Sequence, residues 1–153
     1  MWWLKSDSTK IKLTYLLSYV LGIGFLDQII KYFSLNFKDS PVSVGPIDFV
    51  WYENPGIAFS INLSLPIAIV LASITLIILL WLFFKAKKSL NYYQLGLVLI
   101  IAGGLSNLLD KIFFGFVRDM VAISILPVFN LADLSILAGI ILIIVEWSRE
   151  KTT

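Results

Sequence analysis

The sequence PIAIVLASITLIILLWLFF, residues 66–84, contains no charged side chain, and no charge falls between Glu53 and Lys85. An α-helix needs about 20 mostly apolar residues to cross the hydrocarbon core of a bilayer. Pro66 suits the first turn of such a helix, where its missing N–H group costs no hydrogen bond.

Across all 153 residues, 59% are hydrophobic and 14% are charged. Soluble domains average about 25% charged residues, so the composition predicts an integral membrane protein. It excludes an ordinary cytosolic enzyme, a disordered protein and a secreted disulfide scaffold.

Three further apolar segments have the length of a membrane-spanning helix. They cover about residues 13–33, 93–113 and 126–147. With residues 66–84 they predict an all-α membrane fold of four transmembrane helices. We see no internal repeat, low-complexity tract or second domain, and we expect residues 1–153 to form one integral membrane domain.

The basic residues predict the orientation of these helices, because cytoplasmic loops carry an excess of Lys and Arg. Eight of the twelve basic residues fall on one side of the predicted spans: Lys5, Lys10, Lys12, Lys85, Lys87, Lys88, Arg149 and Lys151. Both termini are therefore expected on the cytoplasmic side of the membrane. Residues 36–65 and 114–125 should then lie outside.

The first outer segment, about residues 36–65, does not have a helical pattern. Residues 40–46 and 47–52 are typical of short strands, and Asn54-Pro55-Gly56 is a strong turn signal. We expect a small β element between the first two helices, lying on the outer membrane surface. Trp51 and Tyr52 are suited to the headgroup region. The second outer segment is predicted as a short turn that carries Asp119.

The missing residue types restrict the chemistry. The sequence has no Cys and no His, which excludes thiolate and Ser-His nucleophiles and makes a zinc site unfavourable. We expect no cofactor and no metal. A net charge of +2 gives no indication of nucleic-acid binding. Catalysis, if present, must come from carboxylates, ammonium groups, guanidinium groups, hydroxyls and amides.

The polar residues of the predicted helices gather near one membrane face. Ionisable side chains inside a bilayer are costly and indicate function. The group consists of Asp27, Lys31, Asn107, Asp110, Lys111, Asp119, Asn130 and Asp133. Asp27 and Lys31 are four residues apart on one helix face, and a structural ion pair is the favoured reading there. Gly103-Gly104 would let another helix approach closely, either for packing alone or to help a substrate fit.

Asp119 and Asp133 lie on either side of a chain reversal and could meet near the membrane surface. Two carboxylates that share a site hold one proton between them, because both cannot ionise so close together. Such a pair can activate water and protonate a leaving amine. The alternative is structural: Asp119 would pair with Arg118 or Lys111, and Asp133 would cap a helix. The residues alone leave these two readings about even.

Four motifs in order give the chain a resemblance to the lipoprotein signal peptidase (signal peptidase II) family, bacterial membrane aspartyl proteases. Residues 27–31, DQIIK, resemble the family's Asp-x-x-x-Lys. Residues 54–59, NPGIAF, resemble its Asn-x-Gly-x-x-Phe. Residues 107–111, NLLDK, and 115–119, GFVRD, resemble its Asn-x-x-Asp-Arg and Gly-x-Val-x-Asp. Residues 129–133, FNLAD, resemble its Phe-Asn-x-Ala-Asp. The likeness covers about residues 22–147.

The resemblance implies a fold, an activity and roles for residues. It implies four helices with a β cradle, and cleavage of prolipoproteins on the N-terminal side of a diacylglyceryl-modified Cys. It implies that Asp119 and Asp133 are the catalytic pair. Substrate-binding roles fall on Asn54, Gly56, Asn107 and Lys111. Site-supporting roles fall on Asp27, Lys31, Asp110, Gly115 and Asn130. The partners are prolipoproteins and membrane lipid, and we expect a monomer.

The chain departs from the family pattern at four positions. Lys111 stands where the family has Arg, and a lysine cannot form a bidentate fork. Ser106 replaces a frequent Gly, and Met120 a usual Phe. Arg118 is an unusual charge beside Asp119, whose pKa it would be expected to lower.

Three other functions would suit some of these features. An ion carrier should place its charges near the membrane midplane with access from both sides. A Ser/Lys hydrolase could use Ser106 with Lys111, but these lie on divergent faces of one helix. A membrane scaffold would need no carboxylate pair.

Overall fold

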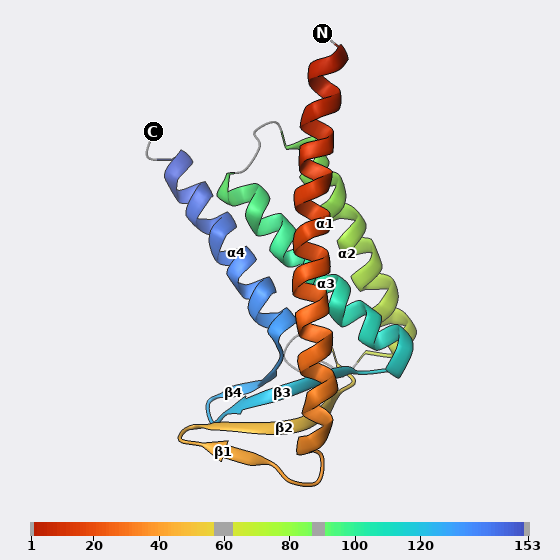
Figure 1. Ribbon diagram of the computed structural model, residues 1–153, viewed down its shortest axis with the longest axis vertical. Coiled ribbons are helices and arrows are strands. Elements are labelled where there is room, and N and C mark those ends of the chain that lie inside the picture. The colour runs from red at the N-terminus through yellow and green to blue at the C-terminus, as the bar shows by residue number, and fades with distance from the viewer. Residues whose placement is uncertain (1, 57–62, 87–90, 152–153) are drawn as a thin grey trace.

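The computed structural model describes residues 2–56, 63–86 and 91–151. They form four helices and one small sheet (Figure 1). The helices are α1 (Trp2–Phe33), α2 (Leu65–Lys85), α3 (Tyr92–Phe114) and α4 (Leu131–Glu150). The strands are β1 (Val42–Val44), β2 (Ile47–Asn54), β3 (Val117–Ile123) and β4 (Leu126–Phe129), and a 3₁₀ turn, Ser34–Phe37, follows α1. Parts of two predicted features, Ile57–Phe59 of the second motif and the basic residues Lys87 and Lys88, lie outside the described residues.

All four helices contain a segment long and apolar enough to cross a bilayer, as the sequence predicted. These segments are Lys10–Phe37, which includes the 3₁₀ turn after α1, and Leu65–Lys85, Tyr92–Phe114 and Leu131–Glu150. Large apolar side chains point outward along them, including Phe25, Ile77 and Phe113. Such a surface would be unfavourable in water and suits contact with lipid tails.

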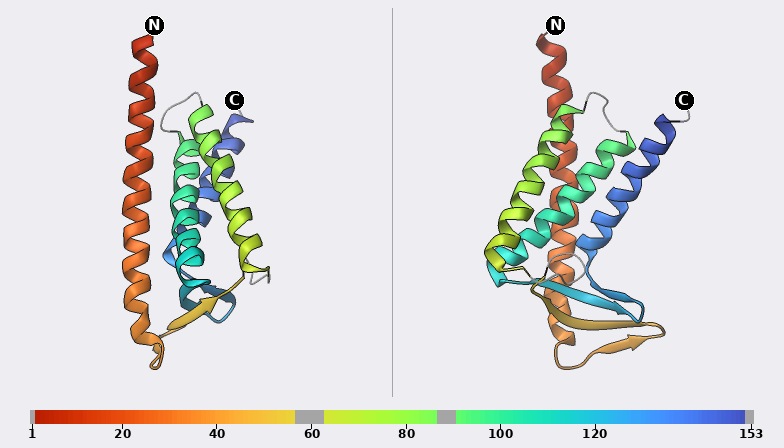
Figure 2. Two further views of the ribbon diagram at one scale, coloured as in Figure 1. Left: turned by 90° about the vertical axis from the view of Figure 1, so that its right-hand side faces the viewer. Right: turned by 180° about the vertical axis from the view of Figure 1, so that it is seen from behind.

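Helix α3 is the centre of the helical layer. It contacts α1, α2 and α4, whereas α1 forms a long column beside the other three helices (Figure 2). Two close crossings join α3 to α4. A Cβ at Gly103 of α3 would lie 2.3 Å from the carbonyl oxygen of Ala132 of α4. A Cβ at Gly96 of α3 would lie 2.6 Å from the carbonyl oxygen of Gly139 of α4. The predicted close approach at Gly103 is confirmed.

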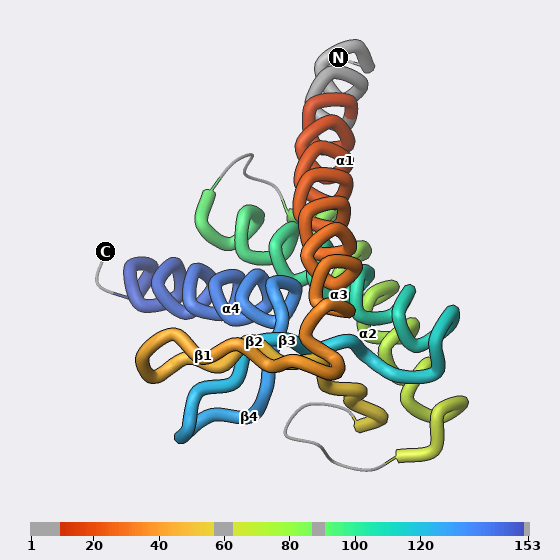
Figure 3. Tube along the Cα trace, turned by 60° about the horizontal axis from the view of Figure 1, so that its bottom comes forward, coloured from red at the N-terminus to blue at the C-terminus, as the bar shows by residue number. Residues whose placement is uncertain are grey.

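The sheet is antiparallel and has the strand order β1-β2-β3-β4. It crosses the end of the helical layer where α1 ends and α4 begins, while both chain termini lie at the other end (Figures 1 and 3). The predicted β element between the first two helices is therefore present. It is half of a larger sheet, because β2 pairs with β3.

Two predictions about the second outer segment were wrong. Residues 126–129 form strand β4, so the fourth helix begins at Leu131 and not near Leu126. Pro127 is tolerated there because β4 is an edge strand, where a missing N–H group breaks no ladder bond. Asp119 lies on strand β3 and not in a turn. Pairing with β2 explains this, since Tyr52 stands opposite Asp119.

Candidate active site

The junction of the sheet with α1, α3 and α4 gathers the polar residues that the sequence singled out. Hydrogen bonds and ion pairs join Asp27, Lys31, Asn54, Gly56, Asn107, Asp110, Lys111, Asp119, Asn130 and Asp133. Gly115 contributes differently. It ends α3 with a φ of 84°, a left-handed conformation that glycine adopts without steric cost. That turn directs the chain from α3 into β3.

Asn130 contacts both of the carboxylates proposed from the sequence. Its side-chain amide donates to Asp119 Oδ1 at 2.6 Å. Its backbone N–H donates to Asp133 Oδ2 at 3.2 Å, and its Oδ1 accepts from the backbone N–H of Asp133 at 2.8 Å. One residue therefore holds Asp119 of β3 and Asp133 of α4 at a single place.

Asp133 also caps its helix. The reciprocal bonds with Asn130 form a capping box at the start of α4, which satisfies N–H groups that the first turn would leave free. The second carboxylate oxygen, Oδ1, accepts from Asn107 Nδ2 at 2.8 Å. The structural reading of Asp133 is confirmed by these bonds. It does not exclude chemistry, because the side chain is only half-buried.

Asp119 is fully buried and is held through the turn after β2. Asn54 Nδ2 donates to Asp119 Oδ2 at 2.9 Å, and Asn54 Oδ1 accepts from the backbone N–H of Gly56 at 3.0 Å. Lys111 Nζ donates to the carbonyl oxygen of Gly56 at 2.6 Å. The Asn-x-Gly turn therefore links the two side chains. Its Asn54 donates to Asp119, and the carbonyl oxygen of its Gly56 accepts from Lys111. No ion pair joins Asp119 to Arg118 or Lys111 among the described residues.

Burial dominates the electrostatics of Asp119. Burial is the largest cause that raises the pKa of this carboxyl, the nearby Asp133 carboxylate also raises it, and the hydrogen bonds from Asn54 and Asn130 and the charge of Lys31 lower it. The net result is a pKa of about 7. The guanidinium of Arg118 lies against Asp110 and not against Asp119.

A second layer of buried charges lies beneath the two carboxylates. Lys31 Nζ lies 2.6 Å from Asp27 Oδ2 and 3.1 Å from Asp110 Oδ2, which confirms the predicted ion pair of the first motif. It also donates to Asn107 Oδ1 at 2.9 Å, so it supports the amide that binds Asp133. Asp27 Oδ1 accepts from the backbone N–H of Ala132 at 2.9 Å. Helix α1 is therefore joined to the first turn of α4.

The charges of the cluster balance when the carboxylate pair holds one proton. The negative groups are Asp27, Asp110, Asp119 and Asp133, and the positive groups are Lys31, Lys111 and Arg118. Four negative and three positive charges leave one excess negative charge, which a single proton removes. A buried site of low dielectric favours that neutral state. Within the described part of the chain, no group of three or more acidic residues is arranged to hold a metal ion.

Sequence reasoning missed the structural roles of three residues. Gln28 Nε2 donates to Asp110 Oδ1 and to Ser106 Oγ, each at 3.0 Å. Ser106 Oγ donates to Asp27 Oδ2 at 2.7 Å, so its hydroxyl supports α1 and does not face Lys111. Arg118 binds Asp110 and Gln28. The one available signal was that Gln28 and Arg118 are polar residues within the motifs and Ser106 is a polar residue beside one.

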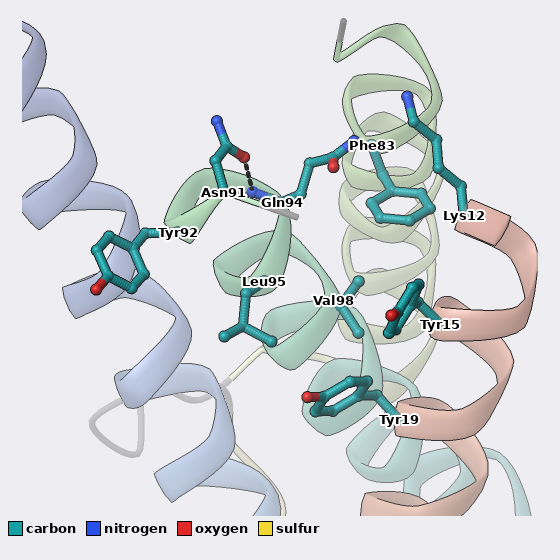
Figure 4. Close-up of a pocket in the computed structure, with 9 residues that line it drawn as sticks. All are labelled: Lys12, Tyr15, Tyr19, Phe83, Asn91, Tyr92, Gln94, Leu95 and Val98. Atoms are coloured by element: carbon teal, nitrogen blue, oxygen red, sulfur yellow. Dashed lines mark hydrogen bonds between the residues drawn. The ribbon is translucent and has the colours of Figure 1, made fainter. Parts of the chain in front are cut away.

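A separate cavity of about 150 Å³ lies at the opposite end of the helices, between α1, α2 and α3 (Figure 4). Its lining includes Lys12, Tyr15, Tyr19 and Phe83 but no carboxyl group. Lys12 Nζ donates to the carbonyl oxygen of Ala86. This cavity lacks the acid and base that the junction with the sheet provides, so it is a poor candidate for hydrolysis.

Comparison with known proteins decides the family. The model of the signal peptidase (SPase) II family matches residues 19–149. The chain belongs to the signal peptidase II family. Its relatives include lipoprotein signal peptidases of Caldicellulosiruptor bescii, 38% identical over 81% of this chain and 84% of the relative, and of Lactococcus lactis, 33% identical over 93% and 98%. Another, from Bartonella henselae, is 35% identical over 91% of this chain and 93% of the relative.

Solved structures agree with this assignment. A bacterial membrane enzyme determined by the in meso method at 2.3 Å resolution superposes with a TM-score of 0.82 and 26% identity, covering 90% of each chain. A second such structure, at 1.9 Å resolution, gives a TM-score of 0.78 and 26% identity over 88% of this chain and 92% of the other. This member of the signal peptidase II family is therefore a multi-pass membrane protease.

Proposed function

We propose that the protein removes signal peptides from lipid-modified prolipoproteins, cutting on the N-terminal side of a diacylglyceryl-modified Cys. The lipoprotein signal peptidases of three bacteria in the comparison support the substrate class. The single observation that carries the chemistry is Asn130, whose side chain and backbone bind both Asp119 and Asp133.

In the proposed mechanism, water lies between the two carboxyl groups, which share one proton. The ionised carboxylate takes a proton from the water while the water oxygen attacks the carbonyl carbon of the scissile amide. The protonated carboxyl gives its proton to the leaving nitrogen. The C–N bond breaks, and the pair again holds one proton, now on the other partner. The pair titrates as a unit, so the roles of base and acid belong to the pair. The pKa of about 7 for Asp119 supports shared protonation near neutral pH.

The residues around the pair would position the substrate. Asn54 and Asn107 each donate a hydrogen bond to one carboxylate of the pair, so a peptide bond held at the pair would lie next to both amides. Lys111 uses one of its three N–H donors on Gly56, so two remain for a substrate carbonyl. Gly56 would allow close approach of the peptide. Asp27, Lys31, Asp110, Gly115 and Asn130 would support this arrangement.

The proposal includes an orientation in a bacterial inner membrane. The sheet and the carboxylate pair would face the extracytoplasmic side, and both termini the cytoplasm, as the distribution of basic residues favours. The scissile bond would then meet water at the membrane surface while the acyl chains of the substrate stay in the bilayer. We further propose that residues 1–153 act as one membrane domain and as a monomer.

The decisive experiment compares purified wild-type protein with Asp119→Asn and Asp133→Asn in detergent, using a diacylglyceryl-modified prolipoprotein. Asn preserves shape and polarity but cannot exchange the proton, so each variant should lose at least about 100-fold in cleavage rate. Asp48→Asn is the matched control, because Asp48 is exposed on β2 of the same sheet. It should cleave like wild type.

Each other outcome has a defined meaning. Near-normal cleavage by a folded Asp119→Asn or Asp133→Asn variant would refute the carboxylate mechanism. Equal cleavage of an unlipidated substrate by the wild type would refute the lipid requirement. An inert wild type would favour a scaffold that shares ancestry with the family.

A further inference from the structure

Arg118 is a buried cation that the family motifs do not include. Its side chain is almost fully buried. Nη2 donates to Asp110 Oδ1 at 2.7 Å, Nε lies 3.4 Å from Asp110 Oδ2, and the backbone N–H of Arg118 donates to the same Oδ2 at 3.0 Å. One residue thus contacts both oxygens of one carboxylate through its side chain and backbone. Such forked contact restricts orientation as well as distance.

These contacts connect three elements behind the carboxylate pair. Arg118 belongs to β3, Asp110 to α3, and Gln28, whose Oε1 accepts from Nη2, to α1. The guanidinium also lies over the ring of Phe114, 4.2 Å from its centroid. Asp119 is the next residue along β3, so any shift of Arg118 relative to α3 moves Asp119 as well. The chain has a lysine at position 111, where the family has its arginine, and the guanidinium of this site comes from position 118.

The charge of Arg118 also matters to the pair. The titratable and charged groups that face Asp119 and Asp133 come from every element around them. They are Asp27 and Lys31 of α1, Asp110 and Lys111 of α3, Arg118 of β3, and Tyr52 and Glu53 of β2, which stand opposite Asp119 and Arg118 in the sheet. Tyr52 and Glu53 are exposed. Without Arg118, Lys31 would be the one cation contacting the two buried carboxylates of Asp27 and Asp110 among the described residues.

We propose that Arg118 is a positioning residue for the hydrolytic reaction. Through Asp110 it holds β3, and with it Asp119, against α3, and its positive charge keeps the Asp119–Asp133 pair singly protonated near neutral pH. This inference rests on the proposed function, because it assigns a role within the same site.

The test is the pH dependence of kcat for cleavage of the lipid-modified substrate. Arg118→Gln removes a positive charge, which favours protonated carboxyls, so both limbs of the profile should move to higher pH by at least about half a unit. Its maximal kcat should fall by roughly 10-fold or more, since misplacing a reacting group is costly. Arg118→Lys keeps the charge but not the fork, so the profile should stay in place while kcat falls.

Two further variants separate charge from loss of structure. Asp110→Asn with Arg118→Gln removes one charge of each sign, so its profile should return to that of the wild type. Asp110→Asn alone should move the profile to lower pH, and it provides the test of charge if Arg118→Gln does not fold. Arg149→Gln, at the far end of α4, is the matched control for loss of an arginine and should leave the profile unchanged.

The inference is overturned if Arg118→Gln is folded and keeps the wild-type profile, or if Arg118→Lys moves the profile as far as Arg118→Gln does. It is also overturned if Asp110→Asn moves the profile upward or leaves it in place. Asp119→Asn, measured alongside, separates the two proposals. If that variant is inactive and the Arg118 variants behave like wild type, this inference alone fails. If Asp119→Asn is active, the proposed function fails.

Discussion

Asp119 illustrates how one buried side chain can link function to a cost in stability. Its carboxyl is fully buried, and burial raises its pKa to about 7. An unfolded Asp has a pKa near 3.9. Between about pH 4 and pH 7, the folded chain therefore keeps a proton that the unfolded chain has released. The contribution of this group to the free energy of unfolding is fully present below about pH 4 and is lost as the pH rises to about 7.

That titration predicts a difference in pH dependence between wild type and Asp119→Asn. One proton changes the free energy of unfolding by about 1.4 kcal/mol per pH unit within this window. The wild type should therefore lose several degrees of melting temperature between pH 5 and pH 7, beyond any loss in Asp119→Asn. Thermal unfolding in detergent at each pH measures this. Asp48→Asn should keep the wild-type slope, and equal slopes in all three proteins would contradict the prediction.

At the scale of elements, the start of α4 is the critical joint. Asn130 and Asp133 cap the helix, Asp27 of α1 accepts from Ala132, and Gly103 of α3 approaches the carbonyl of Ala132. The same turn therefore carries a carboxylate of the site and a close contact between α3 and α4. Local capping and long-range packing act on the same few residues.

Gly103→Ala should disturb this joint. The new methyl group would lie 2.3 Å from the backbone oxygen of Ala132 and 2.9 Å from Ile136 Cγ1, so the helices must move apart. We expect a loss of about 1–3 kcal/mol in stability and reduced cleavage, because Asp133 shifts with its helix. Melting temperature and substrate cleavage measure the two effects.

Two glycines provide graded controls for that prediction. At Gly104 a methyl group would meet the flexible side chain of Leu76 at 3.2 Å, so Gly104→Ala should have a smaller effect. At Gly22 no atom outside the local helix backbone would lie within 4 Å of the new methyl group. Gly22→Ala should therefore be neutral or slightly stabilising, because alanine favours a helix more than glycine does. If Gly103→Ala behaves like Gly22→Ala, the close crossing of α3 and α4 is wrong.

At the scale of the whole molecule, the polar chemistry lies at one end and both termini at the other (Figure 1). Four helices that can cross a bilayer separate these ends. This arrangement is what a protease needs if its substrate is anchored in the membrane and its second reactant is water. It also makes the proposed orientation testable without knowledge of the substrate.

The absence of Cys from the sequence allows single-cysteine labelling of intact cells. Ser43→Cys, exposed on β1, should react with a membrane-impermeant maleimide applied to bacterial spheroplasts. Lys151→Cys, after α4, should react only once the membrane is permeabilised. The reverse pattern would invert the proposed orientation, and labelling of both sites in intact spheroplasts would contradict a barrier between the two ends.

The sequence by itself determined the features that depend on local pattern. Long uncharged runs specify helices in a bilayer wherever they occur, and the i,i+4 spacing of Asp27 and Lys31 was enough to predict their ion pair. The motifs pointed to most of the residues that meet at the junction. For the same reason, the strands after α1 were predictable from their turns and alternation.

Tertiary structure decided the features that depend on pairing between distant segments. Leu126–Phe129 is apolar enough to extend a helix, and its place at the sheet edge beside β3 makes it a strand. Arg118 is adjacent to Asp119 in sequence, yet its partner is Asp110, eight residues away on another element. Sequence adjacency says little about which of two carboxylates a long side chain reaches, because the turn at Gly115 and the pairing of β2 with β3 set its direction.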